Sequence, residues 1–290
     1  MDQAKRQFSP RQVMNSGDFE FFHNTDTRPI DVEYHSHDFY EIYFFLSGKV
    51  SYVIEGKTYH LRSGDILLTN NRELHKPLVG DGRTYDRFVV WIQPAYLRSL
   101  SEKGADLSLC FEASSKRHYN LLRPNSETLQ SVRRLLDKLE DVSDQEIFGK
   151  SILCKAYLME LLVSINMAFF RADNEAEPDI EYNVKISEML RYINENLTGD
   201  LSLDTLSQKF YVSKFHLSRQ FKQYVGLTLH QYIMKKRLIA AKLLLLDGAS
   251  VSAAYAGSGF GDFSNFLKVF KQEFGTSPKK FTEQARQVSL

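Results

Sequence analysis

The chain has 290 residues, 43% of them hydrophobic and 25% charged, and this length is enough for two domains that each bury a core. Its net charge of +1 conceals an uneven distribution: from Asn183 onward 15 Lys and Arg residues face 8 Asp and Glu, whereas the rest of the chain has 22 and 28. A basic module joined to an acidic one predicts that phosphate groups are bound in the C-terminal part.

The composition argues against a secreted or membrane-embedded protein. Met1–Pro10 lacks the apolar core of a signal peptide. The most apolar stretch, Ala156–Phe170, is interrupted by polar residues, so we expect no membrane span. The two cysteines, Cys110 and Cys154, lack CxxC spacing, which indicates free buried thiols in a reducing compartment. We therefore expect a soluble, cytoplasmic protein.

Short β-rich runs separated by turn residues occupy residues 18–94. Glycine stands at the turns, and this pattern predicts an antiparallel sandwich or small barrel. The predicted strands are Tyr40–Leu46, Val50–Ile54, Thr58–Leu61, Ile66–Thr69 and Phe88–Ile92.

A histidine-rich motif begins this region. His35, His37 and Glu41 share parity, so on a continuous strand they point to one face, the interior of a barrel. His75 could join them from an adjoining strand. Three imidazoles and one carboxylate suit a divalent transition metal such as zinc, iron, manganese or nickel. The segment resembles the first cupin motif, and residues 64–75 keep the spacing of the second motif without its proline and glycine.

The same side chains allow two uses other than metal binding. They can contact a small molecule directly, for example by hydrogen bonds to sugar hydroxyls, or they can simply fill a polar interior. The single tryptophan is either a stacking surface for a sugar ring or part of the core. The candidate ligand-binding residues are His35, His37, Glu41, His75 and Trp91, and the first four are also the candidate metal ligands.

From Ser126 onward the hydrophobic period becomes helical. We expect a helix over Ser126–Leu139 and a longer one over Gln145–Phe170, which is apolar on most sides and must be buried in its own domain or against a second subunit. The acidic, proline-containing stretch Arg171–Glu181 has no apolar periodicity and predicts a flexible linker. The predicted domains are a sensor (1–122), a helical dimerisation region (123–172), a linker (173–182) and a DNA-binding domain (183–290).

Two similar stretches follow, Leu203–Lys222 and Val251–Lys271, each continuing to a glycine. Each is typical of a short helix, a tight turn and a second amphipathic helix, with Ser213 or Asp262 as the cap of the second helix. This order indicates a helix-turn-helix, whose second helix enters the DNA major groove. Two in tandem allow one chain to read two successive groove segments.

In the first recognition helix, Phe210, Leu217 and Phe221 recur at helical spacing and are expected to face inward. Arg219 is the best base reader, because its planar fork can bond both acceptors of a guanine edge. Phe215 could contact a thymine methyl group. Each polar residue on this face could equally be an ordinary solvated side chain. The candidate DNA-binding residues here are Ser213, Lys214, Phe215, Ser218, Arg219 and Lys222.

In the second recognition helix, Phe266 and Phe270 are predicted core residues. Asn265 suits adenine, and Lys268 suits guanine or phosphate. Leu267 is another outward candidate. The candidate DNA-binding residues here are Phe263, Ser264, Asn265, Lys268 and Lys271.

Residues 183–290 resemble the DNA-binding domain of the AraC/XylS family of transcription regulators. The likeness includes the first helix (Ile186–Leu197), both helix-turn-helix units, and a connecting helix with Tyr232 and Arg237. It implies that the connecting helix holds the two recognition helices about one DNA turn apart. The second unit departs from the family pattern at Tyr255 and Gly257, and a glycine inside a helix costs about 1 kcal/mol. We therefore expect the second unit to be less stable or less specific than the first.

The sequence thus predicts an α+β protein: an N-terminal cupin-like or jelly-roll β-barrel with dimerising helices, and an all-α double helix-turn-helix domain. The predicted function is a ligand-responsive, sequence-specific transcription regulator, and the family resemblance implies that it controls carbohydrate metabolism with a sugar as its signal. Its expected partners are double-stranded DNA, a sugar effector, a second copy of the chain and, for an activator, RNA polymerase. Two alternatives stay open: a metal-dependent cupin enzyme (oxygenase or isomerase) with a helical appendage, and a DNA-binding protein whose cupin only dimerises.

Overall fold

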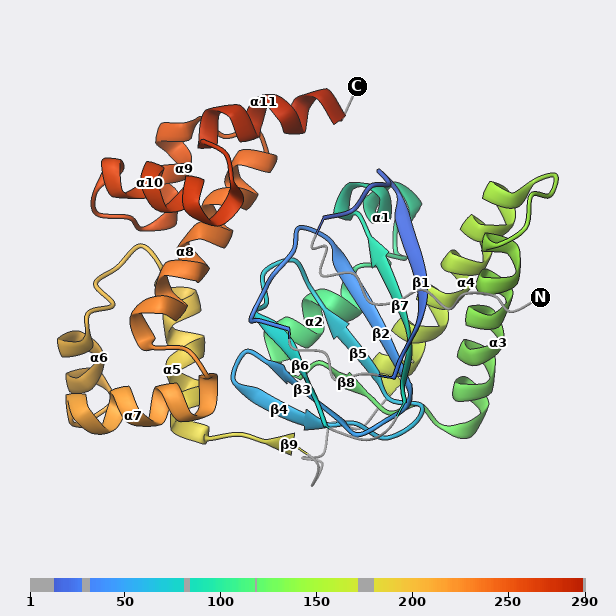
Figure 1. Cartoon of the computed structure of the whole chain (residues 1–290), viewed down its shortest axis with the longest axis horizontal. Coiled ribbons are helices and arrows are strands. Elements are labelled where there is room, and N and C mark those ends of the chain that lie inside the picture. The colour runs from blue at the N-terminus through green and yellow to red at the C-terminus, as the bar shows by residue number, and fades with distance from the viewer. Residues whose placement is uncertain (1–12, 28–31, 81–83, 118, 172–179, 289–290) are drawn as a thin grey trace. The chain divides into compact units, whose positions relative to one another are not determined.

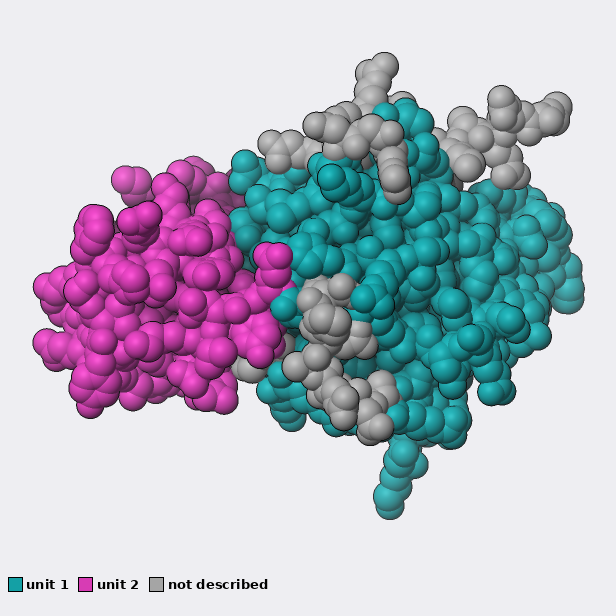
Figure 2. Space-filling model, turned by 90° about the horizontal axis from the view of Figure 1, so that it is seen from below, with its two compact units in different colours: residues 1–54, 58–180 teal, residues 55–57, 181–290 magenta. Residues whose placement is uncertain are grey.

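The computed structural model describes residues 13–27, 32–80, 84–117, 119–171 and 180–288 (Figure 1). It separates the chain into two compact units, which Figure 2 distinguishes by colour. Unit 1 consists of residues 1–54 and 58–180, and unit 2 of residues 55–57 and 181–290. Unit 1 holds the sheets and unit 2 is mainly helical, which confirms the predicted α+β class.

Two sheets form the framework of unit 1. The five-stranded sheet has the order β1-β7-β2-β5-β8, and every registered pair in it is antiparallel. The second sheet has the order β6-β3-β4-β9, and its β3–β6 pair is also antiparallel. The strands are β1 Phe19–Asp26, β2 Tyr40–Ser47, β3 Val50–Ile54, β4 Lys57–His60, β5 Ile66–Thr69, β6 His75–Val79, β7 Tyr85–Ile92, β8 Leu121–Leu122 and β9 Ile180–Glu181.

Strand β2 is apolar at nearly every position because both of its faces are covered. Tyr43 and Phe45 point into a core shared with β3 and β4, between the two sheets. Ile42 and Phe44 point to the opposite face, where they join a second core with the helices. A strand buried on both sides shows a continuous hydrophobic run rather than alternation.

The described residues of unit 1 also form the helices α1 Pro94–Leu100, α2 Leu109–Arg117, α3 Ser126–Ser143 and α4 Lys150–Arg171. Helices α3 and α4 pack along each other (Figure 1). Among the described residues, α4 is the one helix whose length and composition would allow a membrane span, and such a helix alone is weak support for one. Its apolar character has another cause, because Leu158, Leu162 and Ile165 are buried in the core that includes Ile42. Both cysteines are free and buried, as predicted.

Unit 2 contains seven helices over the described residues. They are α5 Val184–Glu195, α6 Leu203–Lys209, α7 Lys214–Val225, α8 Leu229–Leu246, α9 Val251–Ser258, α10 Phe263–Phe274 and α11 Pro278–Val288. The predicted caps are confirmed, since the side chain of Ser213 accepts from the amide of His216 and that of Asp262 from the amide of Asn265. Gly275 ends α10 in the left-handed conformation, as a C-terminal glycine does.

In unit 2, the backbone of Leu197 and Thr198 comes very close to Gly259, which lies in the turn between α9 and α10. Its φ of +84° already favours glycine, and a Cβ atom there would lie 2.0 Å from the carbonyl oxygen of Leu197. The same oxygen accepts a hydrogen bond from Nε of Arg237 in α8, at 2.9 Å. The second helix-turn-helix is therefore packed directly against the backbone that follows α5.

Several predicted boundaries were wrong. The long helix begins at Lys150 rather than at Gln145. Gly149, just before it, has a φ of +76°, which does not fit a right-handed helix. Strands β1 and β6 were not predicted. Most of the predicted linker, residues 172–179, lies outside the described residues.

The unusual Gly257 has a packing reason, since a Cβ atom there would lie 3.0 Å from Cδ1 of Leu244 in α8. Its missing side chain lets α9 approach α8 closely. Tyr255 is half-buried and meets the ring of Phe263 edge-on, with 5.1 Å between the ring centroids.

Two glycines of unit 2 offer a matched test of this packing. Gly275→Ala meets open space, so it should cost about 1–2 kcal/mol for the left-handed backbone alone. Gly259→Ala adds the collision with Leu197 and should cost more than about 4 kcal/mol. Urea unfolding of the full chain, followed by far-UV circular dichroism, measures both. Equal losses for the two variants would contradict the close approach at Gly259.

Candidate functional site

The first recognition helix, α7, turns one face inward and one outward, as predicted. Leu217 and Phe221 are buried. Phe210 instead lies just before the turn as the C-terminal cap of α6, half-buried, with its ring 5.9 Å from that of Tyr192. The predicted DNA-binding side chains are all exposed: Ser213, Lys214, Phe215, Ser218, Arg219 and Lys222.

Four of these side chains line a groove in unit 2. Phe215, Ser218, Arg219 and Lys222 form one wall of this groove, whose volume is about 1090 Å³. Its other lining residues include Arg237 of α8 and the turn 259–261. Three of the named side chains carry a positive charge, while most of the surface of the groove is apolar. Lys214 is directed elsewhere, because it forms an ion pair with Asp204.

The second recognition helix, α10, has a different exposed face. Phe266 and Phe270 are buried, as predicted. Two apolar side chains one turn apart are partly exposed, Phe263 at 40% and Leu267 at 36%. The exposed polar members of this face are Ser264, Asn265, Lys268 and Lys271. This helix therefore offers fewer basic side chains than α7, and both helices expose apolar surface, since Phe215 of α7 is 79% exposed.

The turn before α7 contains a strained residue. Tyr211 has a φ of +51°, a conformation that costs a non-glycine residue roughly 1–2 kcal/mol. Its side chain is 93% exposed, so no packing within the described part of unit 2 compensates for the strain.

Unit 1 contains a buried group of three potential ligands, which we call the interior cluster: His37, Glu41 and His75. One nitrogen or oxygen from each residue lies within 4.8 Å of the others, and all three residues are buried. The predicted strand through His35, His37 and Glu41 was wrong, because β2 begins at Tyr40. His37 instead reaches the cluster from the loop before β2, with its ring stacked at 3.9 Å on that of Phe39.

His35 lies beside the interior cluster but outside the group of three. Its backbone forms an isolated antiparallel bridge with His75, and the two ring centroids are 4.4 Å apart. Trp91 is buried, and its indole N–H donates to Oε2 of Glu41 at 2.7 Å. The tryptophan thus orients the carboxylate of Glu41.

Burial raises the pKa of the Glu41 carboxyl, although the Trp91 hydrogen bond and nearby His35 oppose this shift. Tyr52 also donates to Glu41, at 3.4 Å. The carboxylate of Glu41 therefore accepts hydrogen bonds from two buried side chains, Trp91 and Tyr52. A positive charge beside it would stabilise the carboxylate further.

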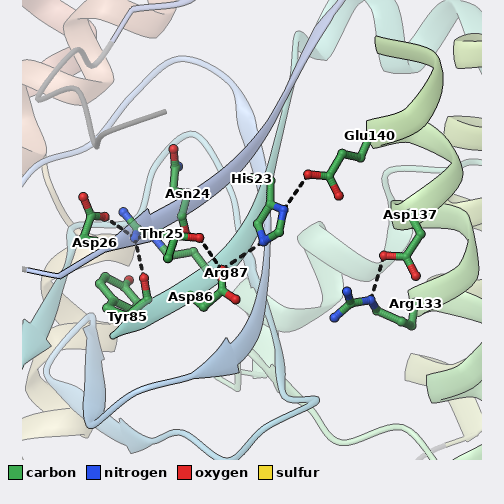
Figure 3. A network of polar contacts seen from close by, with 10 residues as sticks. All are labelled: His23, Asn24, Thr25, Asp26, Tyr85, Asp86, Arg87, Arg133, Asp137 and Glu140. Atoms are coloured by element: carbon green, nitrogen blue, oxygen red, sulfur yellow. Dashed lines mark hydrogen bonds and ion pairs between the residues drawn. The ribbon is translucent and has the colours of Figure 1, made fainter. Parts of the chain in front are cut away.

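Sequence reasoning missed a second set of buried polar residues in unit 1 (Figure 3). Arg87 of β7 forms an ion pair with Asp26 of β1 and lies over the ring of Tyr85, 3.9 Å from its centroid. Tyr85 in turn accepts a 2.7 Å hydrogen bond from the hydroxyl of Tyr43. Two adjacent charged residues, Asp86 and Arg87, in the strand Tyr85–Ile92 were the available signal.

The neighbouring side chain on β7 belongs to a separate network. Asp86 contacts Nε2 of His23 at 2.9 Å, and the other ring nitrogen of His23 lies 2.6 Å from Glu140 of α3 (Figure 3). This chain of contacts ties the five-stranded sheet to α3.

Two family models match the chain. Residues 17–162 match the AraC-like ligand binding domain, and residues 206–284 match a helix-turn-helix domain. The HTH-type transcriptional activator RhaS of Escherichia fergusonii is 28% identical over 258 residues, covering 88% of this chain and 89% of that protein. RhaS of Enterobacter sp. strain 638 is 27% identical over 259 residues, with 88% and 89% covered.

Solved structures with similar chains include regulators of the same type. An AraC-type transcriptional regulator from Chromobacterium violaceum is 28% identical, covers 36% of this chain and 93% of its own, and has a TM-score of 0.33. ToxT from Vibrio cholerae is 15% identical over 91% of this chain and 98% of its own, with a TM-score of 0.35.

Proposed function

Because the chain belongs to the AraC family of transcription regulators, we propose that α7 and α10 read operator DNA and that an effector bound in unit 1 controls this binding. Its relatives are named as transcriptional activators, and the chain is a regulator rather than an enzyme. The observation that carries the proposal is the pair of capped amphipathic helices with exposed polar faces in a basic unit.

We assign α7 the larger share of base recognition. Arg219 can bond both acceptors of a guanine edge, while Lys222, one turn further along the helix, suits a phosphate. In α10, Phe263 and Leu267 suit thymine methyl groups, and Asn265 suits adenine. Both halves of the operator would therefore be read by hydrogen bonds together with apolar contacts, from Phe215 in α7 and from Phe263 and Leu267 in α10.

The proposed effector site is the interior cluster with His35 and Trp91. Supporting this choice, its polar groups are buried between the two sheets and hydrogen-bonded into fixed orientations. The resemblance to family members that control carbohydrate use favours a sugar as the effector. Binding of the effector would shift the equilibrium between different arrangements of the two DNA-binding units in the dimer.

We further propose that the protein is a homodimer assembled through α4. The outward face of α4 has exposed apolar side chains at Ile152, Val163, Met167 and Phe170, with Ala156 between the first two. Successive members are four, seven, four and three residues apart, which places them in one stripe, as in a coiled-coil seam, and the exposed Glu160 fills the gap of seven. A second copy of the same helix would cover this stripe.

By analogy with the activators it resembles, the regulator would act on RNA polymerase in the cytoplasm, where operator DNA is found. Two DNA-binding units in a dimer raise the effective concentration of the second unit once the first is bound, which strengthens binding to a paired operator.

The proposed base contact can be tested by comparing two side chains of α7. Arg219→Ala should lose about 1–3 kcal/mol of binding free energy at one base position and relax the preference there. Lys222→Ala is the matched control and should weaken binding to all sequences alike, with the salt dependence falling by about one unit of slope. Titrations of operator variants at several salt concentrations measure both. Unchanged base preference in Arg219→Ala would contradict the placement of α7.

The proposed dimer can be tested with a charge in the α4 stripe. Val163→Glu would add two carboxylates to a seam that already contains Glu160 of each copy, and should weaken dimerisation by about tenfold or more. Leu78→Glu is a control of similar exposure, 42% against 45%, on β6 of the same unit. Sedimentation velocity over a range of concentrations should show dissociation of the first variant only. A fully dimeric Val163→Glu variant would refute the α4 interface.

A further inference from the structure

We propose that the interior cluster binds a divalent first-row transition metal through His37, Glu41 and His75, and that the effector occupies the remaining coordination position. The placement of the effector on the metal rests on the proposed sensor role of unit 1. The proposed metal binding does not depend on that role.

The tautomers of both histidines in the cluster are fixed by backbone groups. Nδ1 of His37 lies 2.8 Å from the carbonyl oxygen of Phe39, and Nδ1 of His75 lies 3.0 Å from that of Glu73. Because a carbonyl oxygen only accepts, Nδ1 must carry the proton in both rings. The lone pair of each neutral ring is then on Nε2. Metal-binding histidines are usually oriented in this way by a carbonyl or carboxylate behind the ring.

The distances leave room for an ion and are too long for a hydrogen bond. Nε2 of His37 is 3.8 Å from Oε2 of Glu41. In a tetrahedral site with bonds of about 2.0–2.1 Å, neighbouring ligand atoms are about 3.3–3.4 Å apart. The three ligand atoms, which lie within 4.8 Å of one another, would have to move toward a common centre to reach these separations.

The chemistry of the three donors selects the class of metal. Two imidazoles and one carboxylate suit zinc or iron(II), whereas calcium and magnesium prefer oxygen ligands throughout. Three protein ligands leave at least one position open, as in zinc sites that bind an exchangeable molecule.

An independent observation comes from the strand next to Glu41. Thr69 of β5 is directly opposite Glu41 of β2, so both side chains project from the same face of the sheet. Thr69 is completely buried, and within the described part of the chain its Oγ1 has no hydrogen-bond partner. A buried hydroxyl without a partner is costly. A water or an effector oxygen on the metal would supply one.

The proposal is tested on the full-length protein purified without chelators. Elemental analysis should find about one zinc, iron, manganese or nickel ion per chain, either directly or after stripping and reconstitution with each metal. Zinc should raise the melting temperature of the stripped protein. A wild-type protein that binds none of these metals after reconstitution would overturn the proposal, whatever its affinity for DNA.

Three variants identify the site. Glu41→Gln keeps an oxygen that can accept from Trp91 and should still fold, and His75→Ala removes a second ligand. Each should weaken zinc binding by about 100-fold or more. His60→Ala, a half-buried histidine hydrogen-bonded to Ser51, is the control and should retain the metal. Full metal retention by Glu41→Gln would exclude the interior cluster even if His75→Ala failed to fold.

The role of the effector has a separate readout. Operator affinity is measured for the metal-loaded and metal-stripped wild type, with and without a panel of sugars. We expect a sugar to change the affinity of the loaded protein only. A response that survives stripping would refute effector binding at the metal while leaving the sensor role intact. A metal-binding protein that responds to no sugar in the panel would contradict the choice of a sugar effector.

Discussion

The carbonyl oxygen of Leu197 is the point on which the geometry of the DNA-binding unit depends. It accepts a hydrogen bond from Arg237, near the middle of α8, and it faces the Cα atom of Gly259 at a distance that excludes any side chain. Arg237 also donates to the carbonyl of Gly199, at 3.0 Å. One short backbone segment thus holds both the connecting helix and the turn that precedes the second recognition helix.

Helix α8 transmits this constraint to both recognition helices. Near its N-terminal end, Tyr232 meets Phe221 of α7, with 5.6 Å between the ring centroids. Toward its C-terminal end, Ala241 and Leu245 are buried in the same core as Phe266 of α10. Because a packed core resists deformation, the separation of α7 and α10 is a property of unit 2 itself. DNA binding would select operators whose two groove segments match that separation.

The two helix-turn-helix units differ in the residues that form the turn between their helices. In the turn between its two helices, the first has Tyr211 in the left-handed conformation, whereas the second has Gly259 there. The prediction that Gly257 only weakens its helix overlooked its contact with Leu244.

The sequence was most informative where local chemistry and packing agree. The caps at Ser213 and Asp262 and the inward phenylalanines of α10 follow from short-range rules, and the structure confirms them. Strands β3 and β5 were predicted with their observed bounds because they are short apolar runs between turns.

Prediction failed where tertiary contacts override the local pattern. Strand β1 carries polar residues such as His23 and Asp26, whose partners lie on β7 and α3 and are distant in sequence. Strand β6 contains Pro77, which is tolerated because β6 is at the edge of its sheet. The parity argument placed His37 on a strand that does not extend so far, and Thr69 could be connected with Glu41 only through the strand register.

The central claim is that one chain reads two major-groove segments at a separation fixed by α8. Hydroxyl-radical and methylation-protection footprinting on an operator selected from random DNA tests it most directly. We predict two protected major-groove segments for each bound chain, centred about 10 base pairs apart on one face of the duplex. A single protected segment for each chain, or two whose separation varies among selected operators, would contradict the account.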